Sequence, residues 1–519
     1  MRSPAPTPRP VGRARSALSG LLAAAVALAV SEVVAGLLSG APSLVLSVGA
    51  RVVDTVPGPV ERQAIDLLGT ADKPVLLAGI LLLSAACGAL LGVLATRRFL
   101  AGAAGLVAFA VLGGAAALAD PQAGAVPVLV VVQAGAVAGV LALWALLRAA
   151  RVPAVPATVA GGMDRRGFLR AAVAAAALAA AGGLAGQLLE TRQRVGRIRA
   201  AIRLPEPVRA APVAVAGASL DVAGLTPLHV PNARFYRIDT ALRVPQVDPA
   251  TWSLRVHGDV ERPFELSYDE LLALPQVEAD ITIACVSNEV GGSLVGNARW
   301  QGVPLRTLLT RAGVRPGGTQ LLGRSVDGFT AGFPTDTALA LDNAMVAVGM
   351  NGEPLPTDHG FPARIVVPGL FGYVSATKWL SEIELTDSSV EGYWIPRGWA
   401  KQGPVLTQSR IDVPARSARV PAGSTVVAGV AWAPTRGIRS VEVRVDDGPW
   451  EPAELAAALG DECWRQWLYR WDARPGRHRL TVRATDGDSV LQTDARAPVA
   501  PSGATGHHRR DVEVLATGT

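Results

Sequence analysis

The chain has 519 residues, 50% of them hydrophobic, and a formal net charge of +6. Its arginines gather at the ends of apolar segments and after Leu189, which is a membrane-topology signal and excludes the basic, aromatic-interleaved stripe of a nucleic-acid-binding surface. The three cysteines, Cys87, Cys285 and Cys463, lie far apart and imply no disulfide framework, although a Cys285–Cys463 bridge remains open.

Residues 1–190 are rich in Ala, Leu, Val and Gly, whereas the remainder has the mixed composition of a globular protein. The arginines from Arg192 to Arg203 argue against an external position for the residues that follow. The positive-inside rule nevertheless favours a cytoplasmic N-terminus and places everything after residue 190 outside the cytoplasmic membrane, because basic residues collect in alternate loops. Five apolar stretches reach the length of about 20 residues that a membrane helix needs: 17–39, 74–96, 99–119, 125–147 and 168–188.

The fifth apolar stretch opens with Asp164-Arg165-Arg166-Gly-Phe-Leu-Arg170, which matches a twin-arginine export signal. The alternative is an ordinary membrane helix with two basic flanking residues. Because no small-residue cleavage site is evident, we expect the segment to be retained as a membrane anchor.

All six histidines lie after the last predicted membrane helix, from His229 to His508. A bis-histidine haem within the membrane helices is therefore excluded, and no haem is expected. We interpret the first four helices as an anchor or a docking surface.

The soluble half begins with a tether over residues 190–230, rich first in Arg and then in Pro, Ala and Val. Beyond it, short alternating runs and a few helical patterns predict a mixed α+β domain. Ser267-Tyr-Asp-Glu270 predicts a capping box at the start of a helix, and a second short helix is expected over 304–311. Strands are expected near 320–326 and 344–350.

Residues 280–305 are the stretch around which the chain is organised. The alternation of Ile281, Ile283 and Cys285 predicts a strand that delivers Cys285 to a Gly/Ser/Asn-rich loop. A thiolate in that position is a good soft ligand for a transition metal. Taken alone, however, the stretch favours a small buried core cysteine.

A second group of chemically active residues lies between Met350 and Trp379. Pro/Gly-rich loops present His359, Arg364 and Lys378 around a buried strand at 365–367. Lys378 is one of only three lysines in a chain that otherwise uses Arg, which indicates that a compact ammonium is needed there. If they converge, these cations would bind an anionic, phosphate-bearing ligand; each alone is typical of a surface loop.

The C-terminal module, residues 416–500, alternates as strands do and has Asp-Gly turns, which predicts an all-β sandwich of immunoglobulin size. We assign its tryptophans to the core and to a partner surface rather than to a cofactor site.

These stretches together resemble the sulfite oxidase family of molybdenum enzymes. The likeness covers residues 230–500 and rests on Ala284-Cys285-Val-Ser-Asn288, on the run from Met350-Asn-Gly through His359 to Lys378-Trp379, and on Val441–Trp450 of the last module. It implies a molybdopterin-binding α+β domain at 230–395 and an immunoglobulin-like dimerisation domain at 405–505. The membrane half lies outside the likeness, and the apolar stretches predict a four-helix transmembrane region at 1–150, followed by the twin-arginine-like fifth helix and a linker at 151–229.

By this resemblance Cys285 supplies a thiolate to molybdenum, and the other groups contact the molybdopterin. The implied cofactor contacts are Asn232, Tyr236, Arg237, Asp327, His359, Arg364, Thr377 and Lys378. The physical character of the residues agrees, since sulfur suits the metal while cationic and polar groups suit the phosphate and pterin.

The sequence departs from the family where substrate is bound. Glu289-Val290 stands where sulfite oxidases carry an Arg pair, and Val348 stands where they carry a Tyr. Glu289, if it faced the metal, would repel an oxyanion, so a neutral sulfoxide or N-oxide is an alternative substrate to sulfite.

We therefore expect a membrane-anchored molybdopterin oxidoreductase that transfers oxygen atoms outside the cytoplasmic membrane. Its electron partner would be another protein or a quinone, and a homodimer would form through the C-terminal domain. The alternative is a cofactor-free cell-surface binding protein on the same scaffold.

Overall fold

The protein is described from a computed structural model, which covers residues 12–516 except 39, 58–59, 61–62, 65–66, 69–70, 122, 151–162 and 192–193. The side chains of Arg165 and Arg166, and with them the heart of the twin-arginine motif, lie outside the described set. The chain separates into a helical unit, Met1–Arg194 with Ala241–Arg243, and a second unit made of Val195–Thr240 and Val244–Thr519. Each unit is described by itself.

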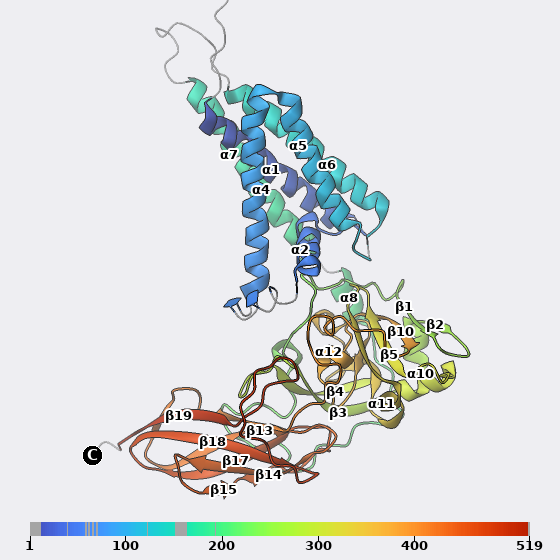
Figure 1. Ribbon diagram of the computed structural model, residues 1–519, viewed down its shortest axis with the longest axis vertical. Helices are drawn as coiled ribbons and strands as arrows, with labels where there is room; N and C mark the ends of the chain where they lie inside the picture. Colours follow the sequence, from blue (N-terminus) through green and yellow to red (C-terminus); the bar gives the residue numbers. More distant parts are fainter. Residues whose placement is uncertain are drawn as a thin grey trace, which may run out of the picture. The chain divides into compact units, whose positions relative to one another are not determined.

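The helical unit consists of long apolar helices around α1, which packs against α4, α6 and α7 (Figure 1). Gly20 of α1 meets Gly88 and Gly92 of α4 so closely that a Cβ on Gly20 would lie 2.0 Å from the carbonyl oxygen of Gly88. Only glycine permits this approach, and small residues allow the same closeness between helices packed in membranes. The helices are α1 (Arg13–Leu37), α2 (Leu44–Thr55), α4 (Asp72–Arg97), α5 (Phe99–Ala117), α6 (Ala125–Ala150) and α7 (Met163–Thr191).

Four of these helices, α1, α4, α5 and α6, are long and apolar enough to cross a membrane. They correspond to the first four predicted spans. The fifth prediction falls on α7, whose apolar portion, Gly167–Gly183, is shorter than the other four. A crossing by α7 therefore stays a prediction.

The second unit begins with an α+β domain built on two sheets. One sheet has the order β2-β1-β10-β5-β6, and the other has the order β3-β4-β7-β8 with β9 also paired to β7. The strands of the first sheet are β1 (Ser253–Gly258), β2 (Phe264–Ser267), β5 (Gln320–Ser325), β6 (Thr330–Pro334) and β10 (Leu380–Thr386). Those of the second are β3 (Val277–Ala284), β4 (Val295–Pro304), β7 (Met345–Met350), β8 (Glu353–Pro354) and β9 (Arg364–Val366).

Short helices join these strands, and both predicted helices are present. In α9, Ser267 Oγ accepts from the Glu270 N–H, and the Glu270 carboxylate accepts from the Ser267 N–H at 2.8 Å, which confirms the capping box. The helices are α8 (Arg194–Ala201), α9 (Tyr268–Ala273), α10 (Leu305–Ala312), α11 (Thr335–Ala340) and α12 (Gly372–Ser375), with 3-10 turns at Asn232–Arg234 and Thr357–His359.

The C-terminal module is a sandwich of two sheets, ordered β11-β13-β17-β16 and β12-β19-β18-β14-β15. Residues of both sheets, among them Trp467, Trp471 and Leu480, share one core. The strands are β11 (Gln408–Val413), β12 (Arg419–Pro421), β13 (Gly423–Trp432), β14 (Ile438–Val445), β15 (Trp450–Pro452), β16 (Glu454–Leu455), β17 (Arg465–Ala473), β18 (Gly476–Asp486) and β19 (His508–Leu515).

The sandwich extends beyond the boundary of 505 that the sequence predicts. Strand β19 pairs antiparallel with β18 and parallel with β12, so it is integral to its sheet. The signal was missed because β19 opens with His508-Arg509-Arg510, where only the later Val512 and Val514 are buried apolar residues.

The predicted tether is an ordered strap over much of its length. Residues 202–230 form no regular helix or strand, but Arg209 bridges in parallel to Val277 at the edge of β3. Farther along, the Leu220 N–H donates to Gln466 Oε1 of β17 at 2.7 Å. The strap therefore contacts both domains of the second unit.

Candidate functional site

Cys285 lies immediately after β3, as the alternating sequence predicts. Its N–H donates to the Leu294 carbonyl at 2.9 Å, and its own carbonyl accepts from the Asn288 N–H at 3.1 Å, which closes a compact loop. The thiol is free, and so is that of Cys463, so the two are not bridged. Burial raises the pKa of the Cys285 thiol, while hydrogen bonds from Ser287 oppose the shift. A bound cation would be needed to hold the thiolate at neutral pH.

Tyr236 lies next to this thiol. Burial raises the pKa of the Tyr236 phenol, a negative charge on Cys285 raises it further, and the guanidinium of Arg364 opposes the shift. The neighbouring Phe235 ring stacks on Tyr236, with centroids 5.2 Å apart, and meets His359 edge-on at 5.6 Å. Phenol, thiol and guanidinium therefore share one neighbourhood, and the phenol is a neutral hydrogen-bond donor at physiological pH.

Arg364 is a buried cation without an obvious counterion. Its Nη1 donates to the His359 carbonyl at 3.1 Å, and its Cζ lies 5.1 Å from the centroid of the Trp300 ring. Its Nε is buried without a hydrogen-bond partner, and no carboxylate pairs with it among the residues that the structure describes. Burial lowers the pKa of Arg364 to about 10, so the group is still charged at pH 7. Such a group is costly unless an anion completes it.

Lys378 is the second buried cation. Its Nζ lies 2.7 Å from Asp239 Oδ2 and donates to the Asp358 carbonyl at 3.1 Å. Burial lowers the pKa of Lys378 to about 8, with the negative charge of Asp239 opposing the shift, so the ammonium is mostly protonated at pH 7. Arg237 donates to the same carboxylate, with Nε 2.9 Å from Asp239 Oδ2, and it lies in the entry loop, residues 232–239.

His359 lies between the two cations. Its Nε2 is 3.1 Å from the Asn232 carbonyl and therefore donates to it. Burial lowers the pKa of His359, and the charges of Arg364 and Lys378 lower it further, while Asp358 opposes them. The imidazole is accordingly neutral at pH 7, and its proton is held by the entry loop.

The remaining predicted residues divide into two kinds. Burial raises the pKa of the Asp327 carboxyl, which senses the charges of Asp239 and Lys378 and so belongs to the same cluster. Asn232 and Thr377 point their side chains at protein groups: Thr377 Oγ1 donates to the Gly323 carbonyl at 3.4 Å, and Asn232 Nδ2 donates to Glu353 Oε1 at 2.6 Å. The structure thus brings most predicted residues together, with Asn232 fastening the loop that carries Tyr236.

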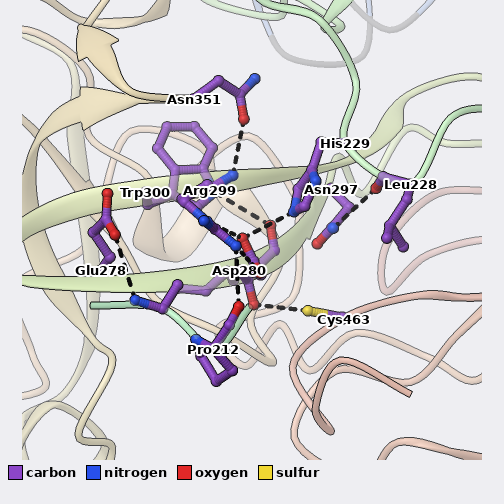
Figure 2. Close-up of polar contacts among 12 residues, drawn as sticks. Pro212, Leu228, His229, Glu278, Asp280, Asn297, Arg299, Trp300, Asn351 and Cys463 are labelled. Carbon is purple, nitrogen blue, oxygen red and sulfur yellow. Dashed lines mark hydrogen bonds and ion pairs between the residues drawn. The ribbon is translucent and has the colours of Figure 1, made fainter. Parts of the chain in front are cut away.

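Asn351 is a residue that sequence reasoning missed. It adopts a left-handed backbone with φ 53° and donates from Nδ2 to Asn232 Oδ1 at 2.8 Å and to the Val230 carbonyl at 3.0 Å. Its Oδ1 accepts from the Arg299 N–H at 3.0 Å (Figure 2). The Asn-Gly pair after β7 marked a turn, which was the available signal, since Asn tolerates this conformation.

A polar cluster behind β3 was also missed (Figure 2). Asp280 and Arg299 are directly opposite in the β3–β4 pair, and Arg299 binds both carboxylate oxygens, through Nε at 2.9 Å and Nη2 at 3.0 Å. His229 Nε2 lies 2.9 Å from Asp280 Oδ1, and the Cys463 thiol donates to the Asp280 carbonyl at 2.9 Å. Side chains alternate between the two faces of a strand, and Asp280 and Cys285 are an odd number of residues apart. The polar cluster is therefore expected on the face of β3 opposite to the Cys285 thiol.

Residues 241–394 match the family model "Oxidoreductase molybdopterin binding domain". The chain is 29% identical to the mitochondrial sulfite oxidase of Rattus norvegicus over 321 residues, 52% of this chain and 58% of that protein. It is 36% identical to the "uncharacterized oxidoreductase YuiH" of Bacillus subtilis over 156 residues, 30% of this chain and 76% of that protein.

The chain therefore spans somewhat more than half of the rat and human sulfite oxidases that it matches, 58% of each. Among solved structures, the sulfane dehydrogenase SoxCD from Paracoccus pantotrophus superposes with a TM-score of 0.49 and 23% identity, over 55% of this chain and 81% of that one. The family assignment rests on the sequence matches.

The ion pairs of Asp280 with Arg299 and His229 are expected to stabilise the fold. Asp280→Asn removes the charge that Arg299 and His229 bind, and we expect it to lower stability by about 2 kcal/mol, because the carboxylate is buried while its partners are partly exposed. The thermal unfolding midpoint of the full-length variant in detergent should fall by a few degrees. Asp511→Asn, at an exposed pair with Arg479, is the matched control and should change little.

The effect of Asp280→Asn should depend on pH. The pKa of Asp280 is lowered in the folded protein: burial by itself would raise it, but hydrogen bonds from His229 and Arg299 outweigh that effect. The stabilisation is therefore complete above the ordinary Asp pKa of about 4 and is lost as the pH falls further. An unfolding difference that stays the same well below pH 4 would contradict this account.

Proposed function

Because the chain belongs to the sulfite oxidase family of molybdopterin-dependent oxidoreductases, we propose that it is a membrane-anchored molybdenum enzyme that carries out two-electron oxygen-atom transfer outside the cytoplasmic membrane. The observation that carries the proposal is Arg364, a buried guanidinium that lacks a carboxylate partner among the described residues and has an orphaned Nε. An anionic cofactor would supply what this group lacks.

The residues present fit a molybdopterin. Cys285 would hold the metal through sulfur, and Arg364 and Lys378 would hold the anionic part of the cofactor. Asp327 and Arg237 lie beside Lys378, at the same end of the cluster. When bound, the cofactor supplies the two-electron oxygen-atom chemistry. The protein keeps His359 neutral, fixes its proton on Nε2 and keeps the Tyr236 phenol protonated as a donor.

Glu289 and Val290 stand where the sulfite oxidases carry an Arg pair that binds an oxyanion. Glu289 is exposed, and Val348 is fully buried in β7. Neutral substrates such as a sulfoxide or an N-oxide suit this surface, and sulfite is the alternative. The four apolar helices support membrane anchoring. We further propose an external protein or a quinone as the electron partner, and a homodimer formed through an immunoglobulin-like sandwich.

Cys285→Ser tests the metal ligand. The wild-type protein from a molybdate-replete host should hold about one molybdenum per chain. The variant should lose the thiolate-to-metal absorption band and most oxygen-atom transfer to an artificial donor or acceptor. Cys463→Ser, at a buried cysteine behind β3, should retain both. A wild-type protein without molybdenum would contradict the proposal and favour a cofactor-free binding protein.

Arg364→Met tests the orphaned cation, and two measurements should move in opposite directions. Cofactor loading should fall at least tenfold, because charged hydrogen bonds to an anion are lost. The thermal unfolding midpoint of protein produced without cofactor should rise or stay level, because an uncompensated buried charge is removed. Arg306→Met, at a half-exposed ion pair with Asp342, is the control. Reduced stability with normal loading would make Arg364 a structural residue.

Val290→Arg tests the substrate surface. A cation two residues beyond Asn288 should raise kcat/KM for sulfite about tenfold, since it would attract the oxyanion. Val290→Leu changes size without charge and should not raise it. The second substitution, Val348→Tyr, should add to the gain only if the buried site in β7 accommodates the ring. An unchanged sulfite activity in Val290→Arg would exclude this account of the pocket.

A further inference from the structure

The loop that follows Cys285 is held from outside its own domain. Within the loop, the Cys285 N–H donates to the Leu294 carbonyl, and Asn288 Oδ1 accepts from the Leu294 N–H at 2.8 Å. A turn from Glu289 to Gly292 forms the tip of the loop, with the Gly292 N–H 2.8 Å from the Glu289 carbonyl. The tip itself is contacted by two residues of the β-sandwich.

Arg410 of β11 makes the first contact. Its Nη1 donates to the Gly292 carbonyl at 2.7 Å. The guanidinium is buried and is fixed on its other edges by Asp412, at 2.6 Å from Nε, and by Thr226 Oγ1, at 2.9 Å from Nη2. A side chain held at three points cannot follow a moving loop, so it limits where Gly292 can lie.

His508, the first residue of β19, makes the second contact. A Cβ built on Gly291 would lie 2.2 Å from Cδ2 and 2.4 Å from Nε2 of the His508 ring, so the ring lies flush against the glycine. Gly291 also has φ +79°, a conformation that favours glycine. The ring is itself fixed, because the Ile411 N–H donates to its Nδ1 at 2.9 Å.

The imidazole of His508 is uncharged, and it contacts the loop by packing rather than through an ion pair. Burial lowers its pKa to about 4, and the nearby Arg510 and Arg410 contribute to the shift. At physiological pH its proton therefore lies on Nε2, on the side of the ring that faces Gly291. The contact with the loop is thus steric, and the hydrogen-bonded contact is that of Arg410.

We propose that Arg410 and His508 are positioning residues, through which the β-sandwich sets the geometry of the Cys285–Leu294 loop and so of the substrate side of the site. The inference rests on the proposed function, because it takes Cys285 as the metal ligand and residues 289–290 as the substrate surface. In this proposal Arg410 and His508 have no direct contact with substrate or cofactor. They act through Gly291 and Gly292, which directly follow Val290 in the chain.

Arg410→Met tests the hydrogen-bonded contact in the full-length protein. Hydrogen exchange of residues 286–294 should become at least tenfold faster, since a buried charged hydrogen bond is lost, and alkylation of Cys285 in cofactor-free protein should accelerate similarly. In loaded enzyme, KM should rise while molybdenum content stays at the wild-type level. Arg410→Lys, which can still donate to Gly292, should recover part of the exchange protection.

Arg465→Met is the matched control. Arg465 is partly buried and, like Arg410, is held by more than one hydrogen bond: it donates to the carbonyls of Ala456 and Ile438, neither of which lies in the loop. It should lower sandwich stability as much as Arg410→Met without changing exchange in residues 286–294. Equal exchange in both variants would overturn the proposal, because the effect would then be general loosening.

A double-mutant cycle tests the steric contact. Gly291→Ala should loosen the loop, and His508→Ala in the same chain should restore part of the protection by removing the ring that the new methyl group meets. Additive effects would overturn the assigned role of His508. A wild-type protein that binds no molybdenum would instead refute the proposed function, while the exchange data would still report whether the sandwich holds the loop.

Discussion

The pairing of β3 with β4 is the constraint on which the site depends. It aligns Asp280 with Arg299 across the hairpin, and the resulting bidentate ion pair locks the register of the two strands. A slip of one residue would move every side chain to the opposite face, so this register decides where Cys285 emerges. His229 from the strap and Cys463 from the sandwich converge on the same aspartate, which couples the hairpin to both neighbours.

Beyond the β3–β4 hairpin, the site contains two buried cations, and burying them costs free energy. Arg364 and Lys378 are both buried, and burial lowers the pKa of each, yet only Lys378 has a carboxylate close by among the described residues. A protein that needed only stability would replace such a cation with an apolar residue. The imbalance is understandable if an anionic ligand completes the site.

Hydrogen bonds join the α+β domain and the β-sandwich of the second unit. The strap over residues 202–230 runs against both of them, and Trp464 donates from Nε1 to the Leu228 carbonyl at 2.9 Å. On the other side, Arg410 reaches the loop after Cys285. Residues of the sandwich therefore limit the movement of the strap and of the Cys285–Leu294 loop.

The sequence alone determined the local features. Hydrophobic length marked four apolar helices, period-two alternation marked β3 and its terminal cysteine, and Ser267 with Glu270 marked a helix start; each depends on neighbours within a few residues. The sequence pattern marked Cys285 and the cations near Lys378, whereas the other candidate site residues came from a family resemblance, which carries residue identity but no distances. It could not separate Asn232, whose side chain holds a loop, from Arg364, whose Nε is left open.

Only the tertiary structure decided which distant residues meet. The contact of Arg410 with Gly292 joins positions 118 residues apart, and that of Cys463 with Asp280 joins positions 183 apart. The last strand was missed for a related reason, because β19 is defined by its hydrogen bonds to β18 and β12 more than by its own composition. Long-range partners leave no periodic signal in one sequence, since the free energy that selects them comes from burial and pairing in the assembled fold.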